Sequence, residues 1–159
     1  MEKAVKDSAT TMTEAVFPND VNNNGTLYGG KLLDWIDTIG GIVAKRHCRT
    51  GVVTASIDSL NFLNPIHQSD IVYLEAWINY VGRTSMEIEV RVTSENPISG
   101  EQTKTCRAFL TYVAVGPDAK PVEVPRLKLE DDEQKERYEM GKERRAERLR
   151  VLKLEPVEW

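Results

Sequence analysis

One helical segment followed by a series of strand segments most constrains the fold of this 159-residue chain. Between residues 28 and 47, apolar residues recur at steps of three and four, as on one face of an amphipathic helix. The segments that follow are rich in β-branched and aromatic residues, and each ends at a turn-forming sequence. These expected strands are residues 52–63, 71–81, 85–92 and 104–115.

A further strand is expected at residues 10–17, and a loop rich in asparagine at residues 19–25 separates it from the helix. Strands joined by tight turns pair antiparallel, and one long helix lies across such a sheet. The sequence therefore predicts an α+β fold. Within residues 85–92 the alternation is strict, with apolar residues expected inward and Glu87, Glu89 and Arg91 outward.

Composition and charge exclude several classes of protein. A net charge of −4 argues against general nucleic-acid binding, which needs a basic face. Apolar runs are too short for a membrane span of roughly 20 residues, and the polar N-terminus does not resemble a secretory signal. Two cysteines, Cys48 and Cys106, are too few for a disulfide framework or a four-cysteine zinc site. We expect a cytoplasmic protein with no metal or other cofactor.

The C-terminal part has a different character. Residues 127–159 are expected to form a charged helical extension to a domain at residues 1–126, with the helix itself at residues 130–150. Acidic and basic residues alternate there at helical spacing, which is typical of a solvated, salt-bridged helix. We expect it to pack on a neighbouring subunit or on the back of its own domain.

Asp37 is the unusual residue of the predicted central helix. It shares a face with small and apolar residues, where a carboxylate is costly to bury unless it has a use. A rotated helix that points Asp37 to water beside Asp34 is the alternative.

Two glycine pairs lie in the same helix. Gly29 and Gly30 open it, where free amide groups and the helix dipole favour negative charge. Gly40 and Gly41 lie inside it and cost roughly 1 kcal/mol each relative to alanine, which predicts tight packing by another element or a ligand. Gly30 and Asp37 are about 10 Å apart along the axis, too far to serve one carbonyl group together. If both take part in one reaction, the second must come from another copy of the chain.

Several segments together resemble the hotdog-fold acyl-CoA thioesterases, the cytosolic acyl-coenzyme A hydrolase family. The resemblance spans residues 17–125. Its segments are residues 18–30 (PNDVNNNGTLYGG), 32–33 (LL), 35–37 (WID), 52–54 (VVT), 61–62 (NF), 65–66 (PI), 81–85 (VGRTS) and 108–115 (AFLTYVAV). The resemblance implies a hotdog fold, in which a curved antiparallel sheet wraps one long helix and the sheets of paired subunits join.

The resemblance also implies roles for individual residues. Asp37 lies at the position of the catalytic carboxylate, as general base or nucleophile, and Asn22 at the loop asparagine that positions water or the thioester carbonyl. The amide of Gly30 resembles the oxyanion donor, and the family places the aspartate and the asparagine on opposite subunits. Residues expected to bind coenzyme A are Gly29, Asn24, Asn61, Gly82, Arg83, Thr84 and Ser85.

The leading hypothesis is therefore hydrolysis of acyl-CoA to a free acid and coenzyme A, by a homo-oligomer of hotdog dimers, a tetramer or hexamer. A non-catalytic acyl-CoA sensor is one alternative, and a hotdog enoyl-thioester hydratase is another. Hydratases of this fold rely on a histidine, whereas His47 and His67 are expected to be surface or loop residues. Neither nucleic acid nor a membrane is expected as a partner.

Overall fold

The computed structural model describes residues 1–154, and residues 155–159 of the predicted C-terminal extension lie outside this range. Its longest elements besides the C-terminal helix are the helix α1 (Gly29–Cys48) and the strands of a five-stranded antiparallel sheet. The strands of this sheet are β2 (Thr10–Ala15), β3 (Gly51–Phe62), β4 (Ile71–Val81), β5 (Ser85–Glu95) and β6 (Gln102–Val115). Their order is β2-β4-β5-β6-β3, so β2 and β3 form the edges. The predicted α+β class and the predicted central helix and strands are confirmed.

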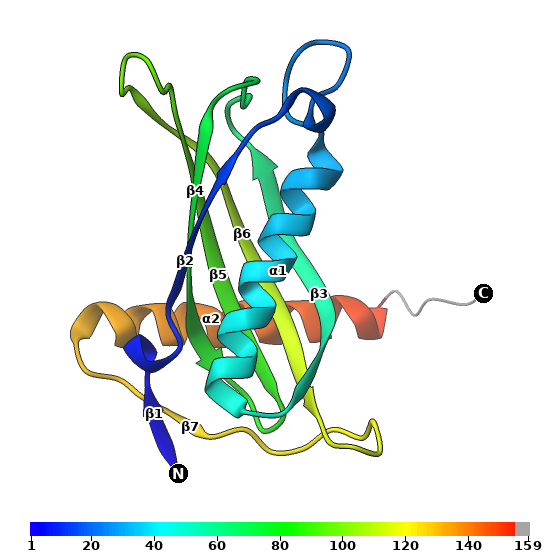
Figure 1. Cartoon of the computed structure of the whole chain (residues 1–159). Helices are drawn as coiled ribbons and strands as arrows, with labels where there is room; N and C mark the ends of the chain where they lie inside the picture. Colours follow the sequence, from blue (N-terminus) through cyan, green and yellow to red (C-terminus); the bar gives the residue numbers. More distant parts are fainter. Residues whose placement is uncertain (155–159) are drawn as a thin grey trace.

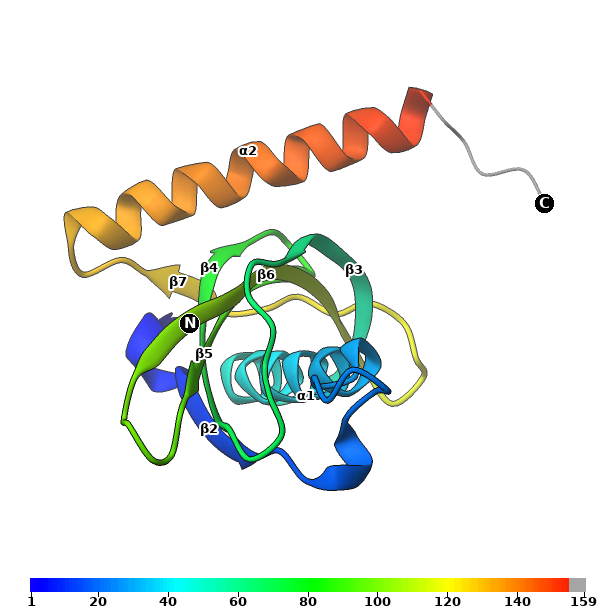
Figure 2. The same ribbon diagram turned by 90° about the horizontal axis from the view of Figure 1, so that it is seen from above.

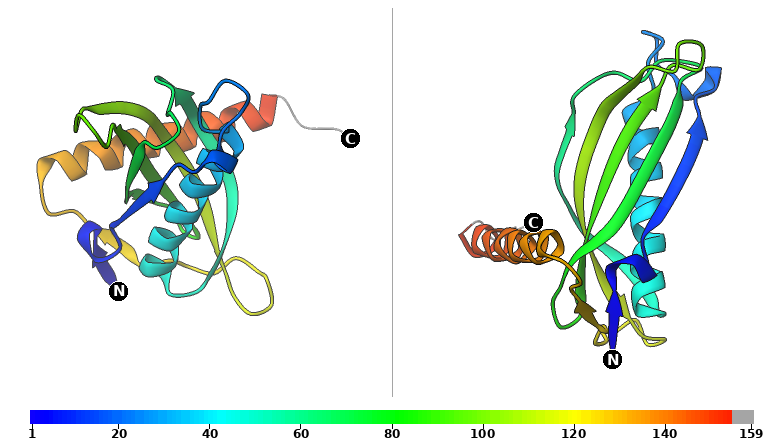
Figure 3. Two further views of the ribbon diagram at one scale, coloured as in Figure 1. Left: turned by 45° about the horizontal axis from the view of Figure 1, so that its top comes forward. Right: turned by 90° about the vertical axis from the view of Figure 1, so that its left-hand side faces the viewer.

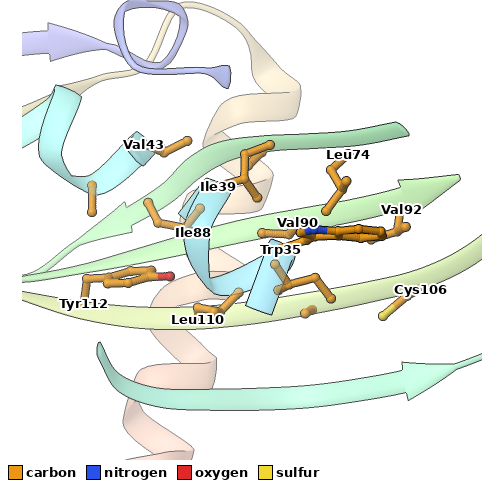
Figure 4. Close-up of a cluster of buried hydrophobic side chains, with 14 of the residues drawn as sticks. Trp35, Ile39, Val43, Leu74, Ile88, Val90, Val92, Cys106, Leu110 and Tyr112 are labelled. Carbon is orange, nitrogen blue, oxygen red and sulfur yellow. The ribbon is translucent and has the colours of Figure 1, made fainter. Parts of the chain in front are cut away.

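The sheet curves around α1 (Figures 1 and 2). The helix points a stripe of buried side chains at the inner face of the sheet, because residues three and four positions apart lie on one side. This stripe consists of Leu32, Trp35, Ile36, Ile39, Val43 and Ala44. Alternate residues of β5, among them Ile88 and Val90, meet it from the sheet (Figure 4). One continuous core results, with α1 as its axis.

A second long helix, α2 (Asp132–Leu154), crosses the outer face of the sheet, on the side away from α1 (Figures 2 and 3). It begins and ends close to the predicted helix at residues 130–150, and it lies on the back of its own domain, one of the two expected places. The residues expected to face outward on β5 do point away from α1. The outward direction is confirmed, but Glu87 and Glu89 are only 4% and 0% exposed, because other side chains cover them on this face.

These buried carboxylates have cationic partners, as buried charges require. Arg144 of α2 makes paired hydrogen bonds to Glu87, the shorter at 2.7 Å, and stacks over the ring of Phe109. Glu89 accepts hydrogen bonds from Asn79, Arg91 and Arg107. Burial alone would raise the pKa of Glu89, but these hydrogen bonds outweigh burial and lower it. Glu89 therefore stays ionised under the sheet's outer surface.

A small second sheet closes the end of the molecule where α1 ends. In it β1 (Glu2–Ala4) runs parallel to β7 (Arg126–Lys128), and the domain boundary predicted between residues 126 and 127 falls within β7. His47 lies beneath this sheet with no exposed surface and donates from Nε2 to the carbonyl of Pro125 at 2.8 Å. The expectation that His47 is a surface or loop residue is therefore wrong. Two short 3-10 turns, Val5–Asp7 and Pro18–Asp20, complete the fold.

Candidate active site

The carboxylate of Asp37 is half-buried on α1 and is held by two hydroxyl groups from the sheet. Its Oδ1 atom accepts a hydrogen bond from Thr54 at 2.9 Å and another from Tyr112 at 2.8 Å. Its Oδ2 atom accepts none within residues 1–154. The alternative in which Asp37 points to bulk water beside Asp34 is therefore not what the structure shows.

Strand register explains why both hydroxyls reach the same oxygen. Thr54 of β3 and Tyr112 of β6 are directly opposite in the antiparallel pair, and their side chains stand on the face toward α1. Neither residue was assigned a role from the sequence, although both lie in segments that carry the family resemblance. The missing signal was the strand pairing, which brings them together across 58 positions of the chain.

The N-terminus of α1 presents free amide groups. Those of Gly29 and Gly30 make no hydrogen bond within residues 1–154, as expected in the first turn of a helix. Asn22 lies in the preceding loop, where its side-chain Oδ1 accepts from the amides of Asn24 and Thr26. The hydroxyl of Thr26 donates to the same oxygen at 3.2 Å. The amide nitrogen of the Asn22 side chain has no partner among the described residues, so it remains available as a donor.

An apolar cavity of about 320 Å³ opens beside these donors. It lies between the start of α1 and the loop that follows β3, and a side chain on Gly29 would meet Phe62 at 3.8 Å. Most of its lining is apolar, with Thr26, Asn64 and Thr105 adding polar atoms. The apolar lining residues are Leu27, Leu32, Phe62, Leu63, Pro65 and Ile66.

The other residues expected to bind coenzyme A lie in two places. Asn24 and Asn61 are exposed near the start of α1, in the Asn22 loop and at the end of β3. The turn from Gly82 to Ser85 lies at the opposite end of the sheet, where α1 ends. Arg83 is largely exposed there and only 3.9 Å from Glu123.

Within one chain, the structure therefore leaves the predicted site residues in three groups. The first is the loop and helix start with Asn22 and Gly30, the second is Asp37 midway along α1, and the third is the turn of Arg83. This separation agrees with the distance argument made from the sequence. It does not place the three groups in one pocket.

The histidines contribute no group to Asp37. His47 lies at the far end of α1, and burial lowers its pKa, with the hydrogen bond to Pro125 opposing that effect in part. His67 is exposed, and its backbone pairs with Thr26 in the Asn22 loop. Among the described residues, no cluster of histidine, cysteine and acidic side chains is placed to hold a metal ion. None of the helices within residues 1–154 is both long and apolar enough to cross a bilayer.

Comparison with known proteins assigns the family. The family model described as Thioesterase superfamily matches residues 24–101. The uncharacterized acyl-CoA thioester hydrolase YkhA of Bacillus subtilis is 48% identical over 129 residues, which are 81% of this chain and 75% of that protein. The chain belongs to the hotdog-fold acyl-CoA thioester hydrolases. It spans 37% of the length of a longer relative, the cytosolic acyl coenzyme A thioester hydrolase of Rattus norvegicus, at 35% identity.

Two solved structures of related hydrolases align with nearly the whole of this chain, α2 included. An apo-hexameric acyl-CoA thioesterase superposes with a TM-score of 0.92 at 41% identity, over 97% of this chain and 99% of that one. The Staphylococcus aureus acyl-CoA hydrolase, in complex with butyryl coenzyme A and coenzyme A, superposes at 0.86 with 34% identity, over 97% and 96%. Structures of three variants of the latter have an aspartate, a threonine or an asparagine replaced by alanine.

Proposed function

We propose that this member of the family hydrolyses acyl-CoA to a carboxylic acid and coenzyme A, with Asp37 as the group that drives the reaction. The observation that carries the proposal is the carboxylate of Asp37, which Thr54 and Tyr112 hold through Oδ1 while Oδ2 accepts no hydrogen bond from the described part of the chain. A positioned base of this kind contributes about 10²–10⁴-fold to a rate. A thioester is already activated, so little more than oxyanion stabilisation is needed in addition.

The chemistry proceeds in two steps. As general base, Asp37 takes a proton from water while the water oxygen attacks the thioester carbonyl, whose oxygen becomes an oxyanion. The amide of Gly30 and the side-chain amide of Asn22 stabilise that charge. The tetrahedral intermediate then collapses, the carbon–sulfur bond breaks, and the thiolate of coenzyme A takes up the proton. As nucleophile, Asp37 instead attacks the carbonyl itself and expels the thiolate of coenzyme A as the carbon–sulfur bond breaks. Water then hydrolyses the resulting mixed anhydride to the carboxylic acid and the free Asp37 carboxylate.

The two proposed donors and the base come from different subunits. Gly30 and Asp37 are too far apart on one helix to serve one carbonyl. The edge strand β3 supports pairing, because it exposes Val53 and Phe62, which are 50% and 55% accessible. Long edge strands with exposed apolar side chains are able to pair with a strand of another chain. We propose a homo-oligomer built from such dimers, and the apo-hexameric relative favours a hexamer.

The substrate then has two distinct parts to be bound. The apolar cavity beside Gly29 accepts the acyl group, since it opens next to the proposed oxyanion donors. The turn from Gly82 to Ser85, together with Asn24 and Asn61, binds the coenzyme A portion, and Arg83 supplies positive charge for its phosphates. That no metal or cofactor takes part, that nucleic acid is not a partner and that the protein works in the cytoplasm stay predictions.

Residue spacing supports the choice of Asn22, Asp37 and Thr54. In this chain Asn22 and Asp37 are 15 positions apart, and Asp37 and Thr54 are 17 apart. The same two spacings separate the asparagine, aspartate and threonine that were replaced in the S. aureus hydrolase. Those residues were targets of study in a protein that covers nearly the whole of this chain.

Release of free thiol tests the function. The wild-type protein is expected to release coenzyme A from a series running from acetyl-CoA to palmitoyl-CoA, and Asp37→Asn to lower kcat by about 10²–10⁴-fold. Asp34→Asn, one turn away on the exposed face, is the matched control and is expected to keep wild-type rates. Binding of acyl-CoA without thiol release would indicate a sensor, and loss of enoyl absorbance from enoyl-CoA without thiol release would indicate a hydratase.

A further inference from the structure

The buried hydroxyl of Tyr112 reaches both the side chain and the backbone of Asp37. We propose that Tyr112 is a positioning residue that fixes the carboxylate of Asp37 so that Oδ2 faces the substrate. The glycine at position 40 leaves the space that Tyr112 needs to reach Asp37. This inference rests on the proposed function. The orientation of the Asp37 carboxylate is at issue, and its role as the catalytic group is taken from that proposal.

Tyr112 is a fixed donor in this arrangement. It is 1% exposed, and its hydroxyl lies 2.8 Å from Oδ1 and 2.9 Å from the main-chain oxygen of Asp37. Burial, together with the neighbouring carboxylate, raises the pKa of Tyr112 far above its usual value. The hydroxyl therefore keeps its proton across the working pH range, so Tyr112 donates to Asp37 and does not act as a base.

Two donors on one oxygen determine which oxygen of Asp37 is free. Thr54 and Tyr112 both donate to Oδ1, which restrains the carboxylate against rotation about its terminal bond. Terminal bonds of this type rotate over a broad range when nothing holds them. Because the tyrosine also bonds the backbone of Asp37, it ties the carboxylate to a fixed point on α1. Positioning of this kind matters because small displacements of a reacting group cost large factors in rate.

Gly40 is what lets the tyrosine approach. A Cβ atom at position 40 would lie 2.5 Å from the Tyr112 hydroxyl oxygen and 3.1 Å from two ring carbons. At position 41 it would lie 3.9 Å from the ring, an ordinary contact. Figure 4 shows the hydroxyl of Tyr112 directed at the ribbon of α1. The costly glycine pair predicted to mark tight packing is thus explained at its first member, and the packing element is β6.

The test compares kcat and KM in variants of the full chain. Tyr112→Phe keeps the ring and removes the hydroxyl, and is expected to lower kcat by about tenfold with KM unchanged. Gly40→Ala displaces the hydroxyl without removing it and is expected to lower kcat to a similar extent. Gly41→Ala adds the same methyl group to the same helix and leaves the Tyr112–Asp37 contact in place, so it is the matched control.

Combined variants separate positioning from general loosening of the core. If both changes act through one hydroxyl, the Gly40→Ala/Tyr112→Phe double variant is no slower than the slower single variant. In an Asp37→Asn background, Tyr112→Phe is expected to have no further effect on the residual rate. If the substitutions instead loosened the core in general, their losses in kcat would be additive in both combinations, and KM would also rise.

The outcomes distinguish this inference from the proposed function. A Tyr112→Phe enzyme whose kcat stays within about twofold of wild type would overturn the positioning role while thiol release still stands. Equal losses of kcat in Gly40→Ala and Gly41→Ala would overturn it as well, because the close approach of Tyr112 to position 40 would then have no particular effect. Should Tyr112→Phe fail to fold, the contrast between the two glycine variants decides the matter. A wild-type protein that releases no thiol would refute the function itself.

Discussion

His47 is a buried residue whose protonation makes the stability of the fold depend on pH. It has no exposed surface, and its Nε2 carries the proton that is donated to Pro125. Its Nδ1 is buried without a partner in the described structure, so a second proton would have no acceptor there. Burial lowers the pKa of His47, which means that the folded protein holds this imidazole neutral where the unfolded chain would charge it.

Acidification is therefore expected to destabilise the protein through His47. The unfolded chain takes up a proton as the pH falls through about 6.5, whereas the folded state resists it. The free energy of unfolding then decreases from about pH 7.5 to 5.5, by an amount equivalent to roughly 2–4 °C in Tm. In His47→Gln, thermal unfolding should lose this part of the pH dependence. His67→Gln, at an exposed position, should retain it, and equal slopes in all three proteins would contradict the prediction.

At the scale of elements, α2 shows how a polar helix docks on a sheet. Its contact face carries arginines, one tyrosine and a glycine in place of an apolar stripe. Arg148 reaches Asp58 of β3 at 3.0 Å, and Tyr138 lies against Tyr80 of β4 with ring centroids 4.8 Å apart. The expected solvated helix is correct for most of its surface. Acidic side chains of the sheet therefore hold α2 in place through ion pairs, whereas apolar side chains hold most docked helices.

Gly141 is the point of closest approach between α2 and the sheet. A Cβ atom there would lie 2.8 Å from the Cβ of Tyr80 and 3.1 Å from a carboxylate oxygen of Glu87. Gly141→Ala is therefore expected to lower the free energy of unfolding by about 1–3 kcal/mol, although alanine is the better helix former. Denaturant unfolding measures this effect. Glu143→Ala, exposed on the same helix, should change stability little, and a stabilised Gly141→Ala protein would show that α2 does not rest on the sheet.

At the scale of the whole molecule, the proposed site residues lie too far apart to form one site within a single subunit. The loop before α1 and the start of α1, which hold Asn22 and Gly30, lie at one end of the domain, and the turn between β4 and β5, which holds Arg83, lies at the other (Figure 1). Asp37 is midway along α1. A twofold-related copy that pairs along β3 would reverse this order beside the first chain. One subunit would then offer its helix start to the Asp37 of its partner.

Mixed dimers test the shared site directly. Asn22→Ala and Asp37→Asn proteins are each expected to be nearly inactive. If they are unfolded together and refolded, mixed dimers carry both defects in one site and neither in the other. Random pairing should then restore thiol release to about a quarter of the wild-type level. Activity that stays at the level of the separate variants would place Asn22 and Asp37 in the same subunit's site.

Local patterns were sufficient for the order and type of the elements. The helix at residues 28–47 and the long strands follow from periodicity and turn residues that act within a few positions, so they could be predicted. Asp37 could be singled out for the same reason, because its conflict with an apolar face is visible in one turn of helix. Thr54 and Tyr112 could not, because their meeting at Oδ1 depends on the register of β3 against β6.

What the amino-acid order determined by itself was thus the hotdog arrangement, the family and the acidic side chain at its centre. The tertiary structure alone decided which groups hold that side chain, that Glu87 and Glu89 are covered, and that His47 is enclosed. The physical reason is the sequence distance over which each interaction acts. Backbone preference and amphipathic spacing act over neighbouring residues, whereas burial and hydrogen bonding join atoms that only the completed fold brings within reach.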